Sequence, residues 1–146
     1  MKTTGSTWAL TAGLVLAAFS SLAASDPVMV VSAKSPISVL TVDQASEIYL
    51  GRLSALPGGI AVTPLEQADG SPAHDDFHAR VTRKSGPMLK AYWSRVIFTG
   101  RGQPPREVAD DDAVKKTLAG NPNAVGYVNA NAVDPTVKVV LTLGGK

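Results

Sequence analysis

The sequence of 146 residues contains no cysteine. Disulfide bridges, thiolate metal sites, cysteine nucleophiles and lipid attachment through cysteine are therefore excluded together. The fold must be stabilised by its hydrophobic core, without covalent cross-links. The chain also lacks a marked excess of either charge, since 13 basic side chains face 12 acidic ones once Lys2 is set aside. A chain so close to neutrality is a poor match for nucleic acid.

Motifs for catalysis and nucleotide binding are missing as well. The sequence has no GxGxxG, no P-loop, no GxSxG and no HExxH, so the common signatures of these functions do not occur. A Ser-His-Asp set can be drawn from Ser71, His74 and Asp75, but neighbours within one helical turn rarely reach the geometry of a proton relay. We predict no enzyme activity, no catalytic residue and no cofactor.

One uncharged apolar run is present, from Trp8 to Leu22, and Lys2 precedes it. The run is short for a membrane span and rich in small residues. Ser21 to Ser25 offers small residues at the positions that a signal peptidase reads, which predicts a cleaved export signal over 1–25. A retained N-terminal anchor is the alternative. We expect the mature chain to be free in an envelope compartment, a bacterial periplasm.

The remaining residues, 26–146, suffice for one domain with a real core. Strands and helices alternate along them, which favours an α/β fold with a mixed sheet flanked by helices. Runs rich in β-branched residues predict the strands. The predicted strands are 28–33, 60–65, 124–128 and 137–143.

Capping residues predict where the helices begin. Thr41 with Gln44 forms a capping box, and Gly51 ends that helix. Another helix is predicted over 72–82, with Phe77 and Val81 facing the core, and a short one from Asp110 or Asp111 to about Ala119. Between them, 98–107 contains two Pro and two Gly and is predicted to be a loop.

The clearest amphipathic segment follows Ser85. Apolar residues recur there at helical spacing, which is typical of a helix packed on a core. We therefore predict that this helix is buried along one face and that Trp93 anchors the core. The stripe consists of Met88, Leu89, Tyr92, Trp93, Val96 and Ile97.

A basic stretch runs through the same region. From Phe77 to Pro105 the chain has six Lys or Arg and no acid. A solvated helix face is one interpretation, and a contact surface for an acidic partner is the other.

A helix start at Ser71 is the strongest candidate site. Ser71 is a favoured N-cap and Pro72 suits the first helical position. Free backbone N–H groups and the positive end of the helix dipole then face one place, which an anion could occupy. A capped helix without a ligand is the alternative.

The two histidines, His74 and His78, are four residues apart on this predicted helix. That spacing places both rings on one face, and Asp75 or Asp76 could be a third metal ligand. Two histidines alone do not make a site, so we interpret them as a solvated pair and predict no metal.

The order of several motifs resembles the periplasmic phosphate-binding proteins of ABC transporters. The run 67–73 (Gln-Ala-Asp-Gly-Ser-Pro-Ala) is similar to that family's Arg-Ala-Asp-Gly-Ser-Gly-Thr loop. The run 48–52 resembles its helix ending in Phe-x-Gly, and 123–128 its Gly-Ala-Ile-Gly-Tyr-Val strand. The resemblance implies one lobe of a type 2 periplasmic binding protein, with a phosphate-like oxyanion as ligand. The alternatives for a protein partner are a membrane transporter component, a membrane sensor protein and a second copy of the chain that supplies the other half.

The resemblance also assigns candidate ligand residues. Asp69, Gly70 and Ser71 match the loop, whereas Gln67 stands in place of Arg and Ala73 in place of Thr. Charge-assisted hydrogen bonds contribute about 1.5–3 kcal/mol each, so these replacements predict weak oxyanion binding. We expect Asp69 and Ser71 to line one shallow cleft. A protein-interaction role that retains the lobe without its ligand is the alternative function.

Overall fold

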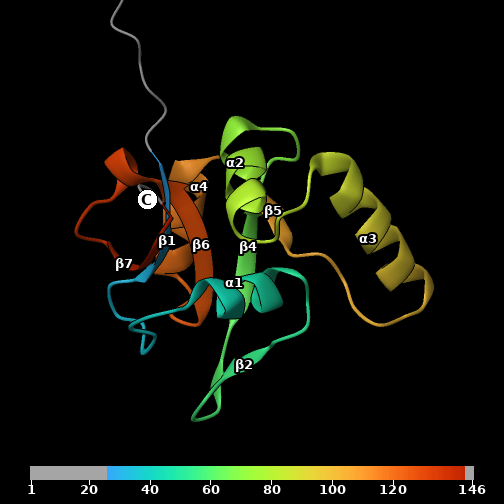
Figure 1. Ribbon diagram of the computed structural model, residues 1–146. Coiled ribbons are helices and arrows are strands. Elements are labelled where there is room, and N and C mark those ends of the chain that lie inside the picture. Colours follow the sequence, from blue (N-terminus) through green and yellow to red (C-terminus); the bar gives the residue numbers. More distant parts are fainter. Residues whose placement is uncertain (1–25, 144–146) are drawn as a thin grey trace, which may run out of the picture.

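The computed structural model describes residues 26–143, so the predicted export signal lies outside the described part. Five strands form one sheet in the order β5-β4-β6-β1-β7 (Figure 1). β4 is parallel to β5 and β6, and β1 is antiparallel to β6 and β7. The predicted mixed sheet is confirmed. Its strands are β1 (Pro27–Ser32), β4 (Thr63–Gln67), β5 (Arg106–Val108), β6 (Ala124–Asn129) and β7 (Val137–Thr142).

Helices cover both faces of the sheet (Figure 1). α1 (Val42–Tyr49) and α2 (Pro72–Arg80) pack on one face, and α4 (Asp111–Ala119) packs on the other. Successive side chains of a strand point to opposite faces, and both faces are buried here. In β1, Met29 and Val31 join the core under α1 and α2, while Val28 and Val30 join the core under α4.

The helix ends follow the capping residues. Thr41 and Gln44 form the predicted capping box, and Asp110 caps α4. Gly51 follows α1 with φ of 72°, a backbone region that favours glycine. The predicted strand over 60–65 is divided, because β3 (Ile60–Ala61) pairs with β2 (Ala55–Leu56) in a hairpin before β4 begins.

Two predictions for 86–107 are wrong. β5 overlaps the end of the predicted loop 98–107, because Arg106, Glu107 and Val108 follow the two prolines and pair with β4. The helix α3 (Gly86–Phe98) lies to one side of the sheet and contributes only Leu89 to the buried residues (Figure 1). Trp93 belongs to neither core cluster and instead packs against Gly51. A Cβ atom at position 51 would lie 3.1 Å from the Trp93 ring.

The connection between β6 and β7 contains a short 3-10 helix, η1 (Ala130–Ala132). No helix within residues 26–143 has the length and apolar character that a membrane crossing requires.

Candidate functional site

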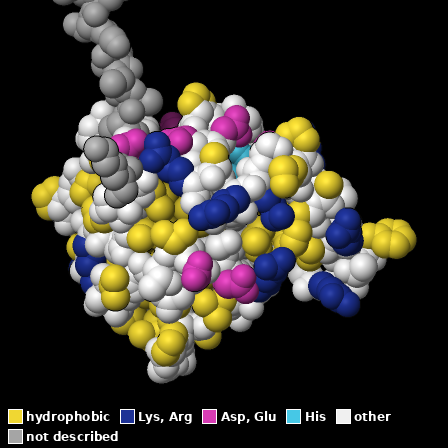
Figure 2. All heavy atoms as spheres, viewed as in Figure 1, with side chains coloured by type: hydrophobic (Ala, Val, Ile, Leu, Met, Phe, Trp, Pro, Cys, Tyr) yellow, Lys and Arg dark blue, Asp and Glu magenta, His cyan; other side chains and the backbone are white. Residues whose placement is uncertain are grey.

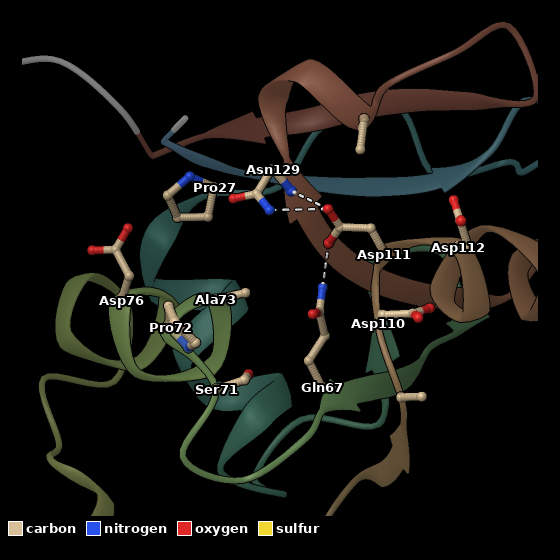
Figure 3. Close-up of a pocket in the computed structure, with 12 residues that line it drawn as sticks. Pro27, Gln67, Ser71, Pro72, Ala73, Asp76, Asp110, Asp111, Asp112 and Asn129 are labelled. Atoms are coloured by element: carbon tan, nitrogen blue, oxygen red, sulfur yellow. Dashed lines mark hydrogen bonds between the residues drawn. The ribbon is translucent and has the colours of Figure 1, made fainter. Parts of the chain in front are cut away.

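A cleft of about 620 Å³ lies where β4 and β6 end and where α2 and α4 begin (Figure 3). The carboxyl ends of parallel strands are the usual place for ligands in α/β sheets. Gln67 ends β4 and Asn129 ends β6, so two amide side chains reach the cleft from adjacent strands. The lining residues are Pro27, Gln67, Ser71, Pro72, Ala73, Asp76, Ala109, Asp110, Asp111, Asp112, Asn129 and Ala132.

Ser71 forms the predicted start of α2. Its hydroxyl accepts a hydrogen bond from the backbone N–H of His74 at 3.2 Å, and Pro72 occupies the first turn. Gly70 precedes it with φ of 78°, which allows the tight turn out of β4. The N-terminus of α2 therefore borders the cleft, but the Ser71 oxygen already serves as its cap.

The carboxylate of Asp111 already engages the amide donors of the cleft. Gln67 Nε2 donates to Asp111 Oδ1 at 2.7 Å and to the Tyr127 carbonyl oxygen at 2.8 Å. Asn129 Nδ2 donates to Asp111 Oδ2 at 3.0 Å (Figure 3). Because a carboxylate accepts hydrogen bonds as an oxyanion does, Asp111 acts as an internal anion in this cleft.

The electrostatics of the cleft are unusual for an anion site. Asp76, Asp110, Asp111 and Asp112 all line it, and none of its described lining residues is Lys or Arg. Like charges that line one cleft repel each other and a bound anion, and more strongly where water is partly excluded. The wall of the cleft therefore opposes a fully ionised oxyanion, and an anion that used the amides of Gln67 and Asn129 would compete with Asp111 for them.

The structure separates the residues that the sequence grouped together. Gln67, Ser71 and Ala73 line the cleft, whereas Asp69 lines a different cavity beside Glu66 and forms an ion pair with Lys90 at 3.6 Å. Gly70 lies between the two cavities in sequence and lines neither of them. The expectation that Asp69 and Ser71 share one cleft is thus wrong, because the turn at Gly70 separates Asp69, in the cavity beside Glu66, from Ser71, in the cleft.

Sequence reasoning missed Asp111 and Asn129 as cleft residues. Asp111 was predicted only as a helix start, and Asn129 lies one residue beyond the predicted strand 124–128. The signal for both was position, since each lies where a strand ends or a helix begins, as Gln67 and Ser71 do.

The expectation of a solvated histidine pair is wrong. His74 and His78 are 5% and 1% exposed, and both side chains face Glu66. The polar neighbours Asp75 and Asp76 suggested a solvent-facing turn. Positions 74 and 78 instead share the inner face of α2 with Phe77, which stacks on Tyr127 with ring centroids 3.9 Å apart.

Several solved structures have a fold similar to that of this chain. A structure described as a phosphate ABC transporter substrate-binding protein with bound phosphate, from Clostridium perfringens, aligns with a TM-score of 0.61 at 23% identity. It covers 79% of this chain and 44% of that protein. An ABC-type phosphate transport receptor from Vibrio cholerae aligns with a TM-score of 0.52 at 20% identity, over 79% and 45% of the two chains.

A further structure, PstS from Borrelia burgdorferi, aligns with a TM-score of 0.58 at 11% identity, over 80% of this chain and 46% of that one. No protein-family model and no curated protein sequence matches the chain. The chain spans less than half the length of the solved structures that it matches. Its α/β fold resembles one lobe of the phosphate ABC transporter substrate-binding proteins.

Proposed function

We propose that this chain is an exported, periplasmic protein of the phosphate ABC transporter substrate-binding type, and that it binds a small oxyanion weakly and without catalysis. A membrane transporter component is its proposed partner. The observation that carries the proposal is the cleft at the N-terminus of α2, where the amides of Gln67 and Asn129 converge beside Ser71. Amide donors and a helix N-terminus are the groups that recognise an oxyanion without a fixed cation.

Weak binding follows from the occupancy of these donors. An incoming oxyanion exchanges hydrogen bonds with Asp111 and gains little, while it meets the charges of the other aspartates. An affinity near 1 mM corresponds to only about −4 kcal/mol. We expect phosphate to bind in the millimolar range and to bind more tightly at a pH where it carries one charge than where it carries two.

The test is calorimetric titration of the protein and of Asp111→Asn with phosphate and with sulfate. The substitution removes one negative charge and weakens the hold on Gln67 Nε2, so phosphate affinity should rise about tenfold, which equals 1.4 kcal/mol. Asp112→Asn is the matched control, because it removes the same charge from the same helix while its carboxylate pairs with Lys115. A smaller gain is expected there.

The difference in phosphate affinity between the two variants separates the effect of the freed hydrogen-bond donors from the effect of the lost charge. Equal gains would show that charge alone acts and that Gln67 and Asn129 contact no ligand. Absence of heat with both anions, in the wild type and in Asp111→Asn, would overturn oxyanion binding.

A second candidate function is a protein-interaction module that retains the lobe without the ligand. The observation that favours it is the outer surface of α3, where Met88, Ile97 and Phe98 are 52%, 55% and 92% exposed. Figure 2 shows hydrophobic side chains together with Lys and Arg over this side of the molecule. Ile97 and Phe98 are adjacent at the end of α3, and exposed apolar groups that lie together mark interaction sites more often than isolated ones do.

A second copy of the chain is the partner most easily tested. Sedimentation velocity of the wild type should show a concentration-dependent dimer if α3 pairs with a second copy. Phe98→Ser should then shift the equilibrium to monomer, whereas Val39→Ser, at an exposed apolar residue outside α3, should not. A monomer at every concentration excludes the second copy as partner.

A further inference from the structure

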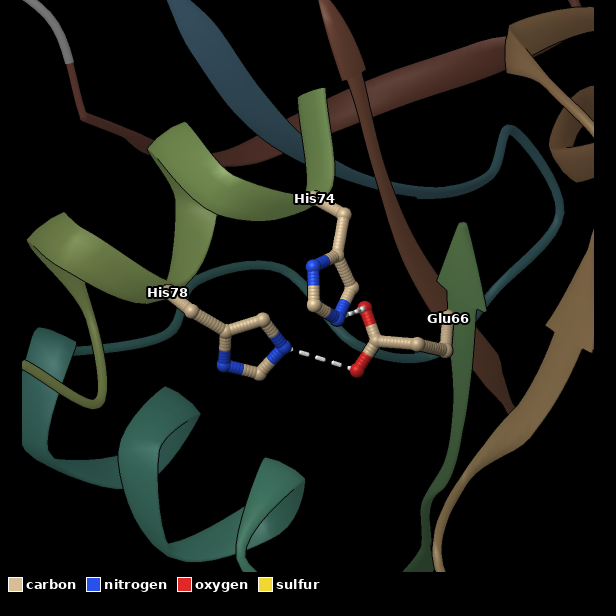
Figure 4. A group of neighbouring side chains, drawn as sticks. All are labelled: Glu66, His74 and His78. Atoms are coloured by element: carbon tan, nitrogen blue, oxygen red, sulfur yellow. Dashed lines mark hydrogen bonds and ion pairs between the residues drawn. The ribbon is translucent and has the colours of Figure 1, made fainter. Parts of the chain in front are cut away.

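Three titratable side chains that do not line the cleft converge on the inner side of α2 (Figure 4). Glu66 comes from β4, and His74 and His78 come from successive turns of α2. His78 Nε2 lies 2.7 Å from Glu66 Oε2, and His74 Nε2 lies 3.9 Å from Glu66 Oε1. One ligand atom from each residue lies within 4.8 Å of the others, and Glu66 is only 8% exposed.

In each histidine ring, the hydrogen-bond partner of Nδ1 indicates which ring nitrogen carries the hydrogen. His74 Nδ1 lies 3.0 Å from Asp75 Oδ1, and a carboxylate only accepts, so this Nδ1 carries the hydrogen. His78 Nδ1 lies 2.9 Å from Thr82 Oγ1, whose own hydrogen is donated to the His78 carbonyl oxygen at 3.2 Å. We therefore assign the hydrogen of His78 to Nδ1 as well. In neutral rings both Nε2 atoms then direct lone pairs toward Glu66.

The Glu66 carboxylate is held in place by Tyr127. The Tyr127 hydroxyl accepts from the backbone N–H of Gln67 at 3.1 Å and donates to Glu66 Oε1. Glu66 thus accepts from Tyr127 while its remaining lone pairs face the two rings.

Lone pairs that face one another are stabilised by a positively charged or hydrogen-bearing group between them. A single proton can join His78 Nε2 to Glu66 at 2.7 Å, but His74 Nε2, at 3.9 Å, lies beyond hydrogen-bond distance of the same carboxylate. We propose that Glu66, His74 Nε2 and His78 Nε2 together bind one divalent transition-metal ion of the zinc class. Two neutral imidazoles and one carboxylate are ligands that this class of ion takes.

The surroundings of the three ligands fit this assignment. Metal-bound histidines usually donate their other ring hydrogen to a carboxylate or an oxygen acceptor, and Asp75 and Thr82 accept those hydrogens here. Ligand atoms on a tetrahedral zinc ion lie about 3.3 Å apart, given bonds of about 2.0–2.1 Å. The two contacts of Glu66, at 2.7 and 3.9 Å, lie on either side of that spacing.

The site also has an approach from solvent. A cavity of about 400 Å³ is lined by Glu66 and His74 and by the side chains of Asp69, Lys90 and Trp93. An ion can enter through this cavity, and the fourth coordination position would face it. A site with three protein ligands and one open position is the arrangement of zinc centres that bind water or a further ligand.

The test is titration of the metal-free protein with Zn²⁺ by calorimetry and with Co²⁺ by visible absorption. We expect one ion per chain, and a Co²⁺ spectrum with the intense d–d bands of a four- or five-coordinate site. Long-range ¹H–¹⁵N spectra should show both histidine Nε2 signals move on addition of Zn²⁺, while both Nδ1 atoms stay protonated. No uptake of either ion would overturn the proposal.

Variants assign the ligands. His74→Ala and Glu66→Gln should each weaken Zn²⁺ binding at least tenfold, because each removes one of three ligands. Asp76→Asn is the matched control: it removes a carboxylate from the same helix that pairs with Arg80, and Zn²⁺ affinity should stay unchanged. Unchanged affinity in His74→Ala and Glu66→Gln would overturn the proposal. If either variant fails to fold, the histidine spectra of the wild type still decide it.

Discussion

The two sides of α2 differ in the state of their polar groups. On the cleft side, the donors of Gln67 and Asn129 are both taken by the carboxylate of Asp111. On the inner side, Glu66 and two histidines bring acceptors together around a small space. An anion must displace part of the chain to enter the cleft, whereas a metal ion would complete the histidine cluster. We therefore expect the cleft side to bind an anion weakly and the inner side to bind a metal ion more tightly.

The largest effect is expected from a substitution of Phe77, because this side chain supports both sides of α2. Phe77 is fully buried between Tyr49 and Tyr127, with ring centroids 4.7 and 3.9 Å away. Phe77→Ala should lower the free energy of unfolding by about 3–5 kcal/mol, because it leaves a cavity under α2. Urea denaturation measures this loss. Ile97→Ala, at an exposed apolar residue of α3, is the control and should change stability by less than about 0.5 kcal/mol.

Phe77→Ala also tests whether the two sides depend on one helix. Zn²⁺ and phosphate affinities should both fall if α2 shifts, since the helix carries two proposed metal ligands and one wall of the cleft. Loss of one affinity alone would show that the two sites are supported separately.

The second largest effect is a difference between the two ligands, Zn²⁺ and phosphate, in how much they stabilise the fold. A ligand that binds only the folded state, at 100 times its dissociation constant, stabilises that state by about 2.7 kcal/mol. Zn²⁺ should therefore raise the unfolding midpoint clearly, and a chelator should reverse this. Phosphate at the same concentration should have little effect, because its expected affinity is millimolar. Glu66→Gln should reduce the response to Zn²⁺ by about half or more, because binding at least tenfold weaker leaves the ion at no more than about 10 times its dissociation constant. A larger response of the wild type to phosphate than to Zn²⁺ would contradict the proposed difference between the two sides.

Local signals predicted most of the fold because their causes are local. The capping box at Thr41 and the cap at Ser71 depend on residues within one turn. The apolar stripe of α3 was misleading, because periodicity shows that a face is apolar but not that another element covers it. β5 was missed because three residues are too few to show a period of two.

The site was harder to predict for the same physical reason. The loop around Ser71 could be found from contiguous residues, but Asp111 is 44 positions from its hydrogen-bond partner Gln67. Glu66 is 12 positions from His78, and Tyr127 is 61 positions from Glu66. Contacts at such separations follow from strand order, which the sequence pattern left open. The adjacent aspartates moreover suggested a solvated turn.

A smaller effect concerns the cap that lies between the two sides. Ser71→Ala removes the acceptor for the His74 N–H and should cost about 1 kcal/mol. Ser71→Asn keeps a capping oxygen and should retain most of that stability. Phosphate affinity should fall in Ser71→Ala, since this residue lines the cleft, while Zn²⁺ affinity should stay within a factor of three. A large loss of Zn²⁺ binding would show that the cap positions His74.

The smallest effect concerns α4, which forms only the cleft side. The Thr136 hydroxyl and Lys115 on α4 lower the pKa of Asp134 from 3.8 to about 2. A carboxylate with a lowered pKa stabilises the fold above its ordinary pKa, and this contribution is lost as the pH falls from about 4 to 2. Hydrogen exchange over that range should show α4 amides losing protection before those of α2. Asp134→Asn should lose this protection at neutral pH already, whereas Asp112→Asn, the more exposed partner of Lys115, should behave as the wild type. Equal loss in α2 and α4 would show that the two sides of the molecule open as one unit.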